Sequence, residues 1–174
     1  MSLWLWVIGV IVLGFAIAGA AFWLYGPERV WELFGPADLG PVSFETLERR
    51  ETRTDALACP TGLCQADNDV LPPVYPVDAA TLRKALLQAL KTERRLTRVA
   101  IDDNLPADRF VQRSEKLRFP DTIVVRYLAL PGGTSTIAIY SRSQLGRGDL
   151  GVNLARIERW LNKLSREVSR MRRN

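Results

Sequence analysis

The sequence of 174 residues contains no histidine, and it has no charged side chain before Glu28. Without histidine, the chain lacks the commonest general base and the commonest metal ligand of proteins. Its two cysteines cannot complete a tetrahedral zinc site by themselves. These absences favour a protein that is not an enzyme, and we expect neither a metal site nor a cofactor.

Because the amino end lacks charge, all 24 basic and 19 acidic residues lie in the remainder, which carries the net charge of +5. Such a small excess fits anionic lipid headgroups or an acidic partner, and it is too weak to predict nucleic-acid binding. We therefore expect no nucleic acid among the partners. The length corresponds to one domain of ordinary size and leaves the oligomeric state open.

Residues Leu3 to Tyr25 form an uncharged, mostly apolar run of 23 residues. A helix of this length crosses the roughly 30 Å hydrocarbon layer of a bilayer. Tryptophan and tyrosine stand near both of its ends, as at membrane interfaces, and Gly26-Pro27 ends it. A cleaved signal peptide would need a basic segment before the run, which is missing. We expect residues 1–27 to be a retained transmembrane anchor.

Gly14, Ala18 and Ala21 share one face of this helix. Small residues there would let a second membrane helix approach closely. The alternative is that membrane helices are generally rich in glycine and alanine, and both interpretations stay open. Basic residues flank the run too sparsely for the positive-inside rule to orient it.

The residues after the anchor change in composition. Residues 28–41 mix apolar and charged side chains and then contain glycine and proline, which indicates an interfacial turn and a linker. Residues 42–174 should form a soluble α+β domain. A strand around Val42 to Leu47 is expected to open it, before the charged run that begins at Glu48.

Periodicity predicts the rest of this domain as an antiparallel sheet of about four to five strands packed by two helices. Asp78 offers an N-cap to an amphipathic helix from about Ala79 to Glu93. Alternating or apolar runs predict strands over Thr97–Ile101, Arg109–Phe119, Ile123–Leu130 and Thr134–Tyr140. The third of these runs is apolar on both faces, so we expect it to be central.

The last helix should run from about Leu150 or Gly151 to near Met171. Its apolar residues are spaced alternately by three and four: Leu154, Ile157, Leu161, Leu164, Val168 and Met171. This seam indicates a face packed on the domain's own sheet more often than a coiled coil. The basic tail from Lys163 onward either lies on an anionic bilayer or is a solvated helix end that complements the helix dipole.

Cys59 and Cys64 enclose a short Pro-Thr-Gly-Leu segment that can turn. They can form a disulfide in an oxidising compartment. The alternatives are two reduced thiols without a role, or a redox pair, although the spacing is not C-x-x-C.

The stretch from Tyr140 to Arg156 gathers polar residues around three glycines: Ser141, Arg142, Ser143, Arg147, Asp149, Asn153 and Arg156. In one hypothesis it is a structural clamp, in which Asp149 caps the last helix and pairs with Arg142 or Arg156. In the other, the arginines and the helix N-terminus bind an anion or a lipid headgroup. A serine nucleophile, or Asp121 and Asp149 as an acid–base pair, would be needed for catalysis.

Two segments resemble the domain of unknown function 1499 family. The first is Leu117-Arg-Phe-Pro-Asp121, where Phe119, Pro120 and Asp121 fit that family's motif. The second, longer motif is matched by Ser141, Arg142, Ser143, Gly146, Asp149, Leu150, Gly151, Asn153, Arg156 and Ile157. The resemblance covers about Cys64 to Leu164. Gln144 replaces an arginine of the motif, and Gly62 to Asp67 depart from the family's usual P-N-C-V-S-S.

The resemblance implies an exported or membrane-anchored bacterial protein and brings no activity with it. We expect a single-pass protein of the bacterial inner membrane with a periplasmic domain, acting as an accessory, assembly or interaction subunit of a membrane protein complex. The alternative is an anion- or lipid-headgroup-binding module, or a hydrolase, that uses residues 141–156. The expected partners are therefore the membrane and either a membrane protein complex or anionic lipid.

Overall fold

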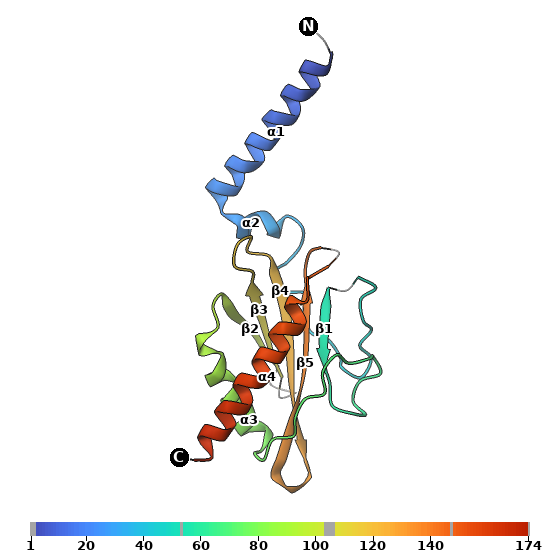
Figure 1. The fold of residues 1–174 in the computed structure, drawn as a ribbon, viewed down its shortest axis with the longest axis vertical. Coiled ribbons are helices and arrows are strands. Elements are labelled where there is room, and N and C mark those ends of the chain that lie inside the picture. Colours follow the sequence, from blue (N-terminus) through green and yellow to red (C-terminus); the bar gives the residue numbers. More distant parts are fainter. Residues whose placement is uncertain (1–2, 53, 103–106, 147, 174) are drawn as a thin grey trace.

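The computed structural model describes residues 3–52, 54–102, 107–146 and 148–173, and it has the predicted α+β fold (Figure 1). An apolar amino-terminal helix precedes a five-stranded antiparallel sheet and two packed helices. The elements in chain order are α1 (Leu3–Tyr25), α2 (Pro27–Glu32), β1 (Asp55–Ala58), α3 (Ala79–Ala89), η1 (Leu90–Thr92), β2 (Leu96–Asp102), β3 (Ala107–Arg113), β4 (Pro120–Leu130), η2 (Pro131–Gly133), β5 (Thr134–Ser143) and α4 (Val152–Met171).

The sheet has the order β1-β5-β4-β3-β2, and each neighbouring pair is antiparallel. Strands β2 to β5 follow one another as a meander, because short turns can join only antiparallel neighbours. The central position of β4 is confirmed. Its residues are buried on both faces, as Val124 at 5% and Val125 at 0% exposure illustrate.

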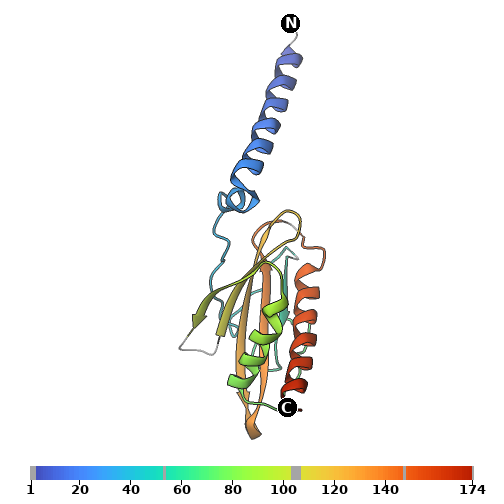
Figure 2. The ribbon, with the colours of Figure 1, turned by 90° about the vertical axis from the view of Figure 1, so that its left-hand side faces the viewer.

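Helices α3 and α4 cover one face of the sheet (Figure 2). Trp160 of α4 is fully buried there, and its ring meets Phe110 of β3 edge-on at a centroid distance of 5.6 Å. Ile157 and Leu164 are fully buried on the same side of α4. The apolar seam of the last helix is therefore a face packed on its own sheet.

Irregular chain covers the other face of the sheet. Phe44 and Leu47 are buried against Leu57, Val124 and Tyr140. The expected strand over Val42–Leu47 is wrong, since this segment forms a turn. Phe44 and Leu47 are three residues apart, so a strand would point them to opposite faces, whereas a turn lets both pack on the sheet.

Strand β3 ends at Arg113, six residues earlier than the expected Phe119. A tight turn follows, in which the backbone nitrogen of Ser114 donates to the carbonyl oxygen of Phe119 at 2.9 Å. Arg118 has a left-handed backbone with φ of 60°, which reverses the chain into β4. The carboxyl-terminal half of the expected strand is therefore the turn between β3 and β4.

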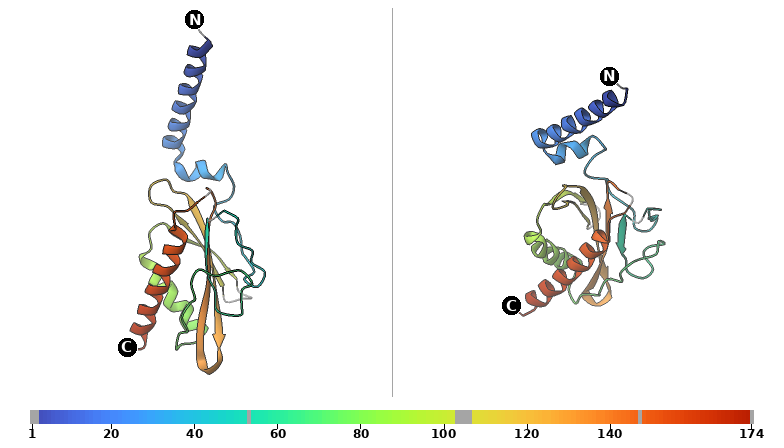
Figure 3. Two further views of the ribbon diagram at one scale, coloured as in Figure 1. Left: turned by 45° about the vertical axis from the view of Figure 1, so that its right-hand side comes forward. Right: turned by 45° about the horizontal axis from the view of Figure 1, so that its top comes forward.

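Helix α1 is long and apolar enough to cross a membrane and lies near the amino terminus. Its residues Gly14, Ala18 and Ala21 stay a predicted packing face for another membrane helix. The carboxyl end of α4 lies at the end of the domain opposite α1 (Figures 1 and 3). This placement favours the second interpretation of the basic tail, a solvated helix end that complements the helix dipole.

Cys59 and Cys64 form a disulfide, with their Cα atoms 6.3 Å apart. The closed loop packs Leu63 and Cys64 against the face of the sheet that the helices leave uncovered. Such a bond persists in oxidising compartments.

Candidate functional site

The predicted polar stretch connects β5 to α4 through the loop of residues 144–151. Leu150 and Gly151 both have left-handed backbones, with φ of 54° and 77°. Two such residues in succession turn the chain sharply into α4, and only glycine adopts this conformation without strain. The loop therefore places Asp149 directly beside the first turn of α4.

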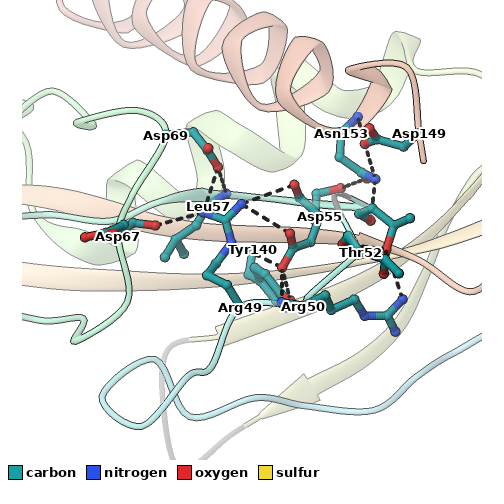
Figure 4. Close-up of polar contacts among 12 residues, drawn as sticks. Arg49, Arg50, Thr52, Asp55, Leu57, Asp67, Asp69, Tyr140, Asp149 and Asn153 are labelled. Atoms are coloured by element: carbon teal, nitrogen blue, oxygen red, sulfur yellow. Dashed lines mark hydrogen bonds and ion pairs between the residues drawn. The ribbon is translucent and has the colours of Figure 1, made fainter. Parts of the chain in front are cut away.

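Asp149 caps α4 from two residues before the N-cap position, which is occupied by Gly151. Its carboxylate accepts hydrogen bonds from the backbone nitrogens of Gly151 and Asn153, both at 3.0 Å. It also accepts one from the side-chain nitrogen of Asn153 at 2.7 Å (Figure 4). The sequence placed Asp149 itself at the N-cap and gave it an arginine partner; the structure gives it amide partners instead.

Replacing Asp149 by alanine should lower the free energy of unfolding by about 1–2 kcal/mol, because the amide of the N-cap residue and one amide of the first helical turn lose their acceptor. Asp149→Asn retains an acceptor oxygen and should lose less. Thermal unfolding of the full chain in detergent measures both. Asp67→Ala is the control, since that side chain is exposed. If Asp149→Ala melts like Asp67→Ala, the carboxylate does not cap the helix.

Arg156 lies at the centre of a buried polar network between α4 and the sheet. The residue is 3% exposed and pairs with Asp121 of β4 at 2.5 Å. It also donates to Gln112 of β3 at 2.7 Å and to the hydroxyl of Ser141 at 2.8 Å. Each strand thus contributes one partner, and the arginine ties three adjacent strands to one helix.

Asn153 completes this network and is fully buried. Its side-chain oxygen accepts from the Ser141 hydroxyl and from Arg156, and its nitrogen donates to the Ser143 hydroxyl at 3.0 Å and to the carbonyl oxygen of Thr54 at 3.1 Å. The last bond joins α4 to the residue before β1 (Figure 4). Ser141 and Ser143 therefore both form hydrogen bonds that stabilise the fold.

Arg142 lies on the opposite face of the sheet from Arg156, because successive residues of a strand alternate between faces. It donates to the carbonyl oxygens of Leu39 and Gly40 at 2.7 and 2.9 Å, and so holds the linker after α2. Burial, followed by the nearby charge of Arg50, lowers the pKa of the Arg142 guanidinium. The anion-site hypothesis placed the arginines beside the N-terminus of the last helix, whereas Arg142 is bonded to the linker on the other face of the sheet. Arg147 lies outside the described residues.

A cavity of about 500 Å³ lies between the segment that precedes β2, the end of β3 and the first turns of α4. Five arginines line it, and four of them pair with carboxylates. The pairs are Arg95–Glu115 and Arg113–Glu28 at 3.6 Å, Arg159–Glu93 at 3.3 Å and Arg156–Asp121 at 2.5 Å. Only Arg94 remains without an ion pair among the described residues, so the cavity presents paired charges rather than a cluster of free cations.

Glu93 in this cavity wall should contribute to stability in a pH-dependent way. Burial raises its pKa, but hydrogen bonds from Lys163, Arg159 and Gln112 outweigh this and lower the pKa from 4.5 to about 2. A carboxylate with a depressed folded-state pKa stabilises the fold above pH 4.5, and this contribution is lost as the pH falls toward about 2.

Glu93→Gln should therefore flatten the acid side of a plot of melting temperature against pH between 4.5 and 2. Glu48→Gln is the matched control, because Glu48 is exposed. Some slope should remain in the variant, since the pKa values of Asp55 and Asp108 are lowered as well. Identical curves for the two variants would contradict the assignment.

The residues of the Leu117–Asp121 motif connect the domain to α2. Phe119 stacks on Trp31 of α2 at a centroid distance of 4.4 Å, and the Trp31 indole donates to the carbonyl oxygen of Leu117 at 2.6 Å. Pro120 begins β4, and Asp121 belongs to the Arg156 network. The Trp31 ring also lies 6.3 Å from Phe22 in α1, so a chain of aromatic contacts joins the apolar helix to the domain.

Sequence reasoning missed two charged clusters. On the face away from the helices, Asp55 accepts from Arg49 in two bonds of 3.2 Å and from the Tyr140 hydroxyl at 2.6 Å (Figure 4). Burial and then the hydrogen bond to Asp55 raise the pKa of Tyr140. No local pattern signals these partners, because Asp55 and Tyr140 are 85 residues apart.

The second cluster surrounds Asp108 on the helix face of β3. Arg83 of α3 donates to its carboxylate at 3.0 and 2.9 Å, Arg98 of β2 also binds it, and the hydroxyl of Tyr127 in β4 donates at 3.0 Å. Burial raises the pKa of Asp108, but these bonds outweigh it and the pKa is lowered. The Asp108 cluster is a second junction between helix and sheet.

These contacts limit the chemistry of the predicted loop. Asp121 is bound by an arginine and Asp149 by amides, so neither is set up as a general acid or base for a shared substrate. Within the described ranges, no group of three His, Cys, Asp or Glu side chains is arranged to hold a metal ion. The arrangement can hold α4, the sheet and the linker together.

Comparison with known proteins gives a family and no activity. None of the curated proteins searched matches the sequence. A family model described as "Protein of unknown function (DUF1499)" matches residues 41–164, a region that begins before the two resembling motifs and contains the whole sheet. Since this match covers most of the 174 residues, the chain belongs to the DUF1499 family.

Proposed function

We propose that the chain is a single-pass protein of the bacterial inner membrane whose periplasmic domain acts as a non-catalytic accessory, assembly or interaction subunit of a membrane protein complex. The observation that carries this proposal is the fixed connection between α2, the linker and the sheet. A domain that is held in one orientation beside its membrane helix is suited to docking on another membrane protein. A domain that only binds a soluble ligand can be joined to its membrane helix by a flexible linker.

Several contacts restrain this connection on the outer face of the sheet. Asp38 pairs with Arg109 of β3 at 2.8 Å, and the backbone nitrogen of Leu39 donates to the hydroxyl of Thr122 in β4 at 2.9 Å. Gln144 donates to the carbonyl oxygen of Pro36 at 2.7 Å. Together with Trp31 and Arg142, these groups tie the segment after α1 to the domain over most of its length.

The polar groups that suggested a ligand site support the same proposal. Arg156, Asn153, Ser141 and Asp149 are bonded to one another or to backbone groups, so they serve the fold. The anion-binding or hydrolase alternative would need several of them free and facing one cavity. The disulfide adds independent support for a domain outside the cytoplasm.

Affinity purification of the full chain in mild detergent, followed by mass spectrometry, tests this function. We expect a membrane protein to co-purify in stoichiometric amount. Trp31→Ala should weaken the complex while the domain stays folded, because the aromatic link to α2 is lost. Trp4→Ala, near the other end of α1, is the control. A chain recovered without a stoichiometric partner would overturn the proposal.

The orientation is tested separately with reporter enzymes fused after Asn174. A reporter that works only in the periplasm should be active there. Activity of a reporter that works only in the cytoplasm would reverse the proposed side and leave the anchor in place.

A further inference from the structure

Two connections reach the end of the domain beside α2, the turn between β3 and β4 and the loop between β5 and α4 (Figures 1 and 3), and each carries an exposed leucine. Leu150, in the loop after β5, is 101% exposed, and Leu117, in the turn between β3 and β4, is 49% exposed. Leu150 has a left-handed backbone, which is a costly conformation for a leucine. An apolar side chain is thus fully exposed on a residue whose backbone conformation is itself costly.

Leu33 and Phe34 directly after α2 are exposed as well. Phe34 lies 6.1 Å from Trp31, which binds the Leu117 carbonyl, so these apolar groups lie beside the contact between α2 and the domain. The opposite end of the domain, where the β4–β5 hairpin turns and α4 ends, lies far from α1 (Figure 1).

Free charges at this end are mainly basic. Among the residues that the structure describes, Arg29, Arg94, Lys116 and Arg118 take part in no ion pair there. The nearby carboxylates of Glu28 and Glu115 are paired with Arg113 and Arg95. The exceptions are Glu32, an exposed carboxylate of α2, and Asp149 beside Leu150, whose carboxylate binds amides and takes part in no ion pair with the described residues. Leucines beside unpaired cations form the pattern of surfaces that lie in the interface of an anionic bilayer.

The chain itself indicates which bilayer would cover this end. Only Gly26 separates the last residue of α1 from α2, and α2 is docked on the turn that carries Leu117. A bilayer spanned by α1 therefore has its surface at the level of α2 and of the adjacent loop tips. Two separate leucine tips suit insertion between lipid headgroups, whereas a protein partner is generally met by a contiguous patch.

We propose that this end of the domain lies on the bilayer that α1 spans, with Leu117 and Leu150 inserted among the headgroups and Arg29, Arg94, Lys116 and Arg118 facing anionic lipid phosphates. This inference rests on the retained anchor of the proposed function. It goes beyond that function by assigning the surface that orients the domain, and it leaves the sides of the domain open for a protein partner.

The full chain in lipid nanodiscs of phosphatidylglycerol and phosphatidylcholine tests the proposal. A fluorophore is attached through Leu150→Cys or Leu117→Cys, since both native cysteines are in the disulfide. Val74→Cys is the matched control, because Val74 is 60% exposed and adjoins Tyr75, which bonds Ser135 at the start of β5, away from α2. Quenching by nitroxide-labelled lipid headgroups is compared with quenching by iodide in solution.

We expect lipid quenching several-fold stronger at the two leucine positions than at the Val74 position. It should fall when phosphatidylglycerol is omitted, or when Arg94→Glu and Lys116→Glu are combined. Arg172→Glu with Arg173→Glu, at the far end of α4, should leave it unchanged. If iodide quenches all three positions equally while the chain stays in the discs, the membrane-facing surface is overturned and the anchor stands. If the chain does not stay in the discs, the retained anchor fails, and both proposals fail with it.

Discussion

Asp121→Ala is expected to lower the free energy of unfolding by about 3–5 kcal/mol, the range measured when one partner of a buried ion pair is removed. The variant leaves the Arg156 guanidinium buried beneath α4 with its charge uncompensated. Gln112 and Ser141 still accept from it, but neutral oxygens offset only part of the cost of burying a cation. The domain should therefore melt far below the wild type in detergent.

Asp67→Ala serves as the matched control for this variant, since it removes an exposed carboxylate. Asp121→Asn should fall between the two, because it keeps an acceptor oxygen and loses the charge. If Asp121→Ala melts within a degree or so of Asp67→Ala, a shift of the size expected for a neutral surface change, then the buried pair does not hold α4 to the sheet.

Asp108→Ala should cost about 2–3 kcal/mol, somewhat less than the loss of Asp121. The Tyr127 hydroxyl is deeply buried and would lose its acceptor. Arg83 and Arg98 are 25% and 32% exposed at their side chains, so they can regain hydrogen bonds to water. The penalty therefore comes mainly from Tyr127 and from the junction of α3 with the sheet.

Tyr127→Phe separates these contributions. Added to Asp108→Ala, it removes the unsatisfied hydroxyl, so the double variant should be less destabilised than the sum of the two single ones. The same variants change the acid response: the lowered pKa of Asp108 stabilises the fold above its usual value of 3.8, and this part is lost as the pH falls. Additive free energies would show that Asp108 and Tyr127 are not coupled.

Sequence periodicity predicted the elements that repeat regularly. The four successive strands, the central position of β4 and the inward face of α4 follow from local alternation and three-four spacing. Strand β1 was not predicted, because Asp55–Ala58 has only four residues and all of them are buried, so no alternation marks it. Its pairing with β5 joins residues far apart in the chain.

The sequence predicted which residues belong to the polar site, but only some of the contacts between them. Asp149 was expected to cap the last helix, and a helix entry carries that information locally. The partner of Arg156 was not predicted, since Asp121 is 35 residues away and the pairing depends on which face of β4 meets α4. Arg142 was grouped with Arg156 because they are close in sequence. Alternation along β5 instead places the Arg142 side chain on the other face of the sheet, where it binds the linker.

Arg156 and Asp121 form an ion pair with each other, so the polar motif stabilises the domain. Interactions with the membrane or a partner are then left to the end of the domain beside α1. A double-mutant cycle of Asp121→Ala and Arg156→Met, measured by unfolding of the full chain in detergent, tests this central claim most directly. We predict that the double variant is much less destabilised than the sum of the single variants, with a coupling energy of about 2–3 kcal/mol. A coupling energy near zero would contradict the claim, because Arg156 would then be available to a ligand.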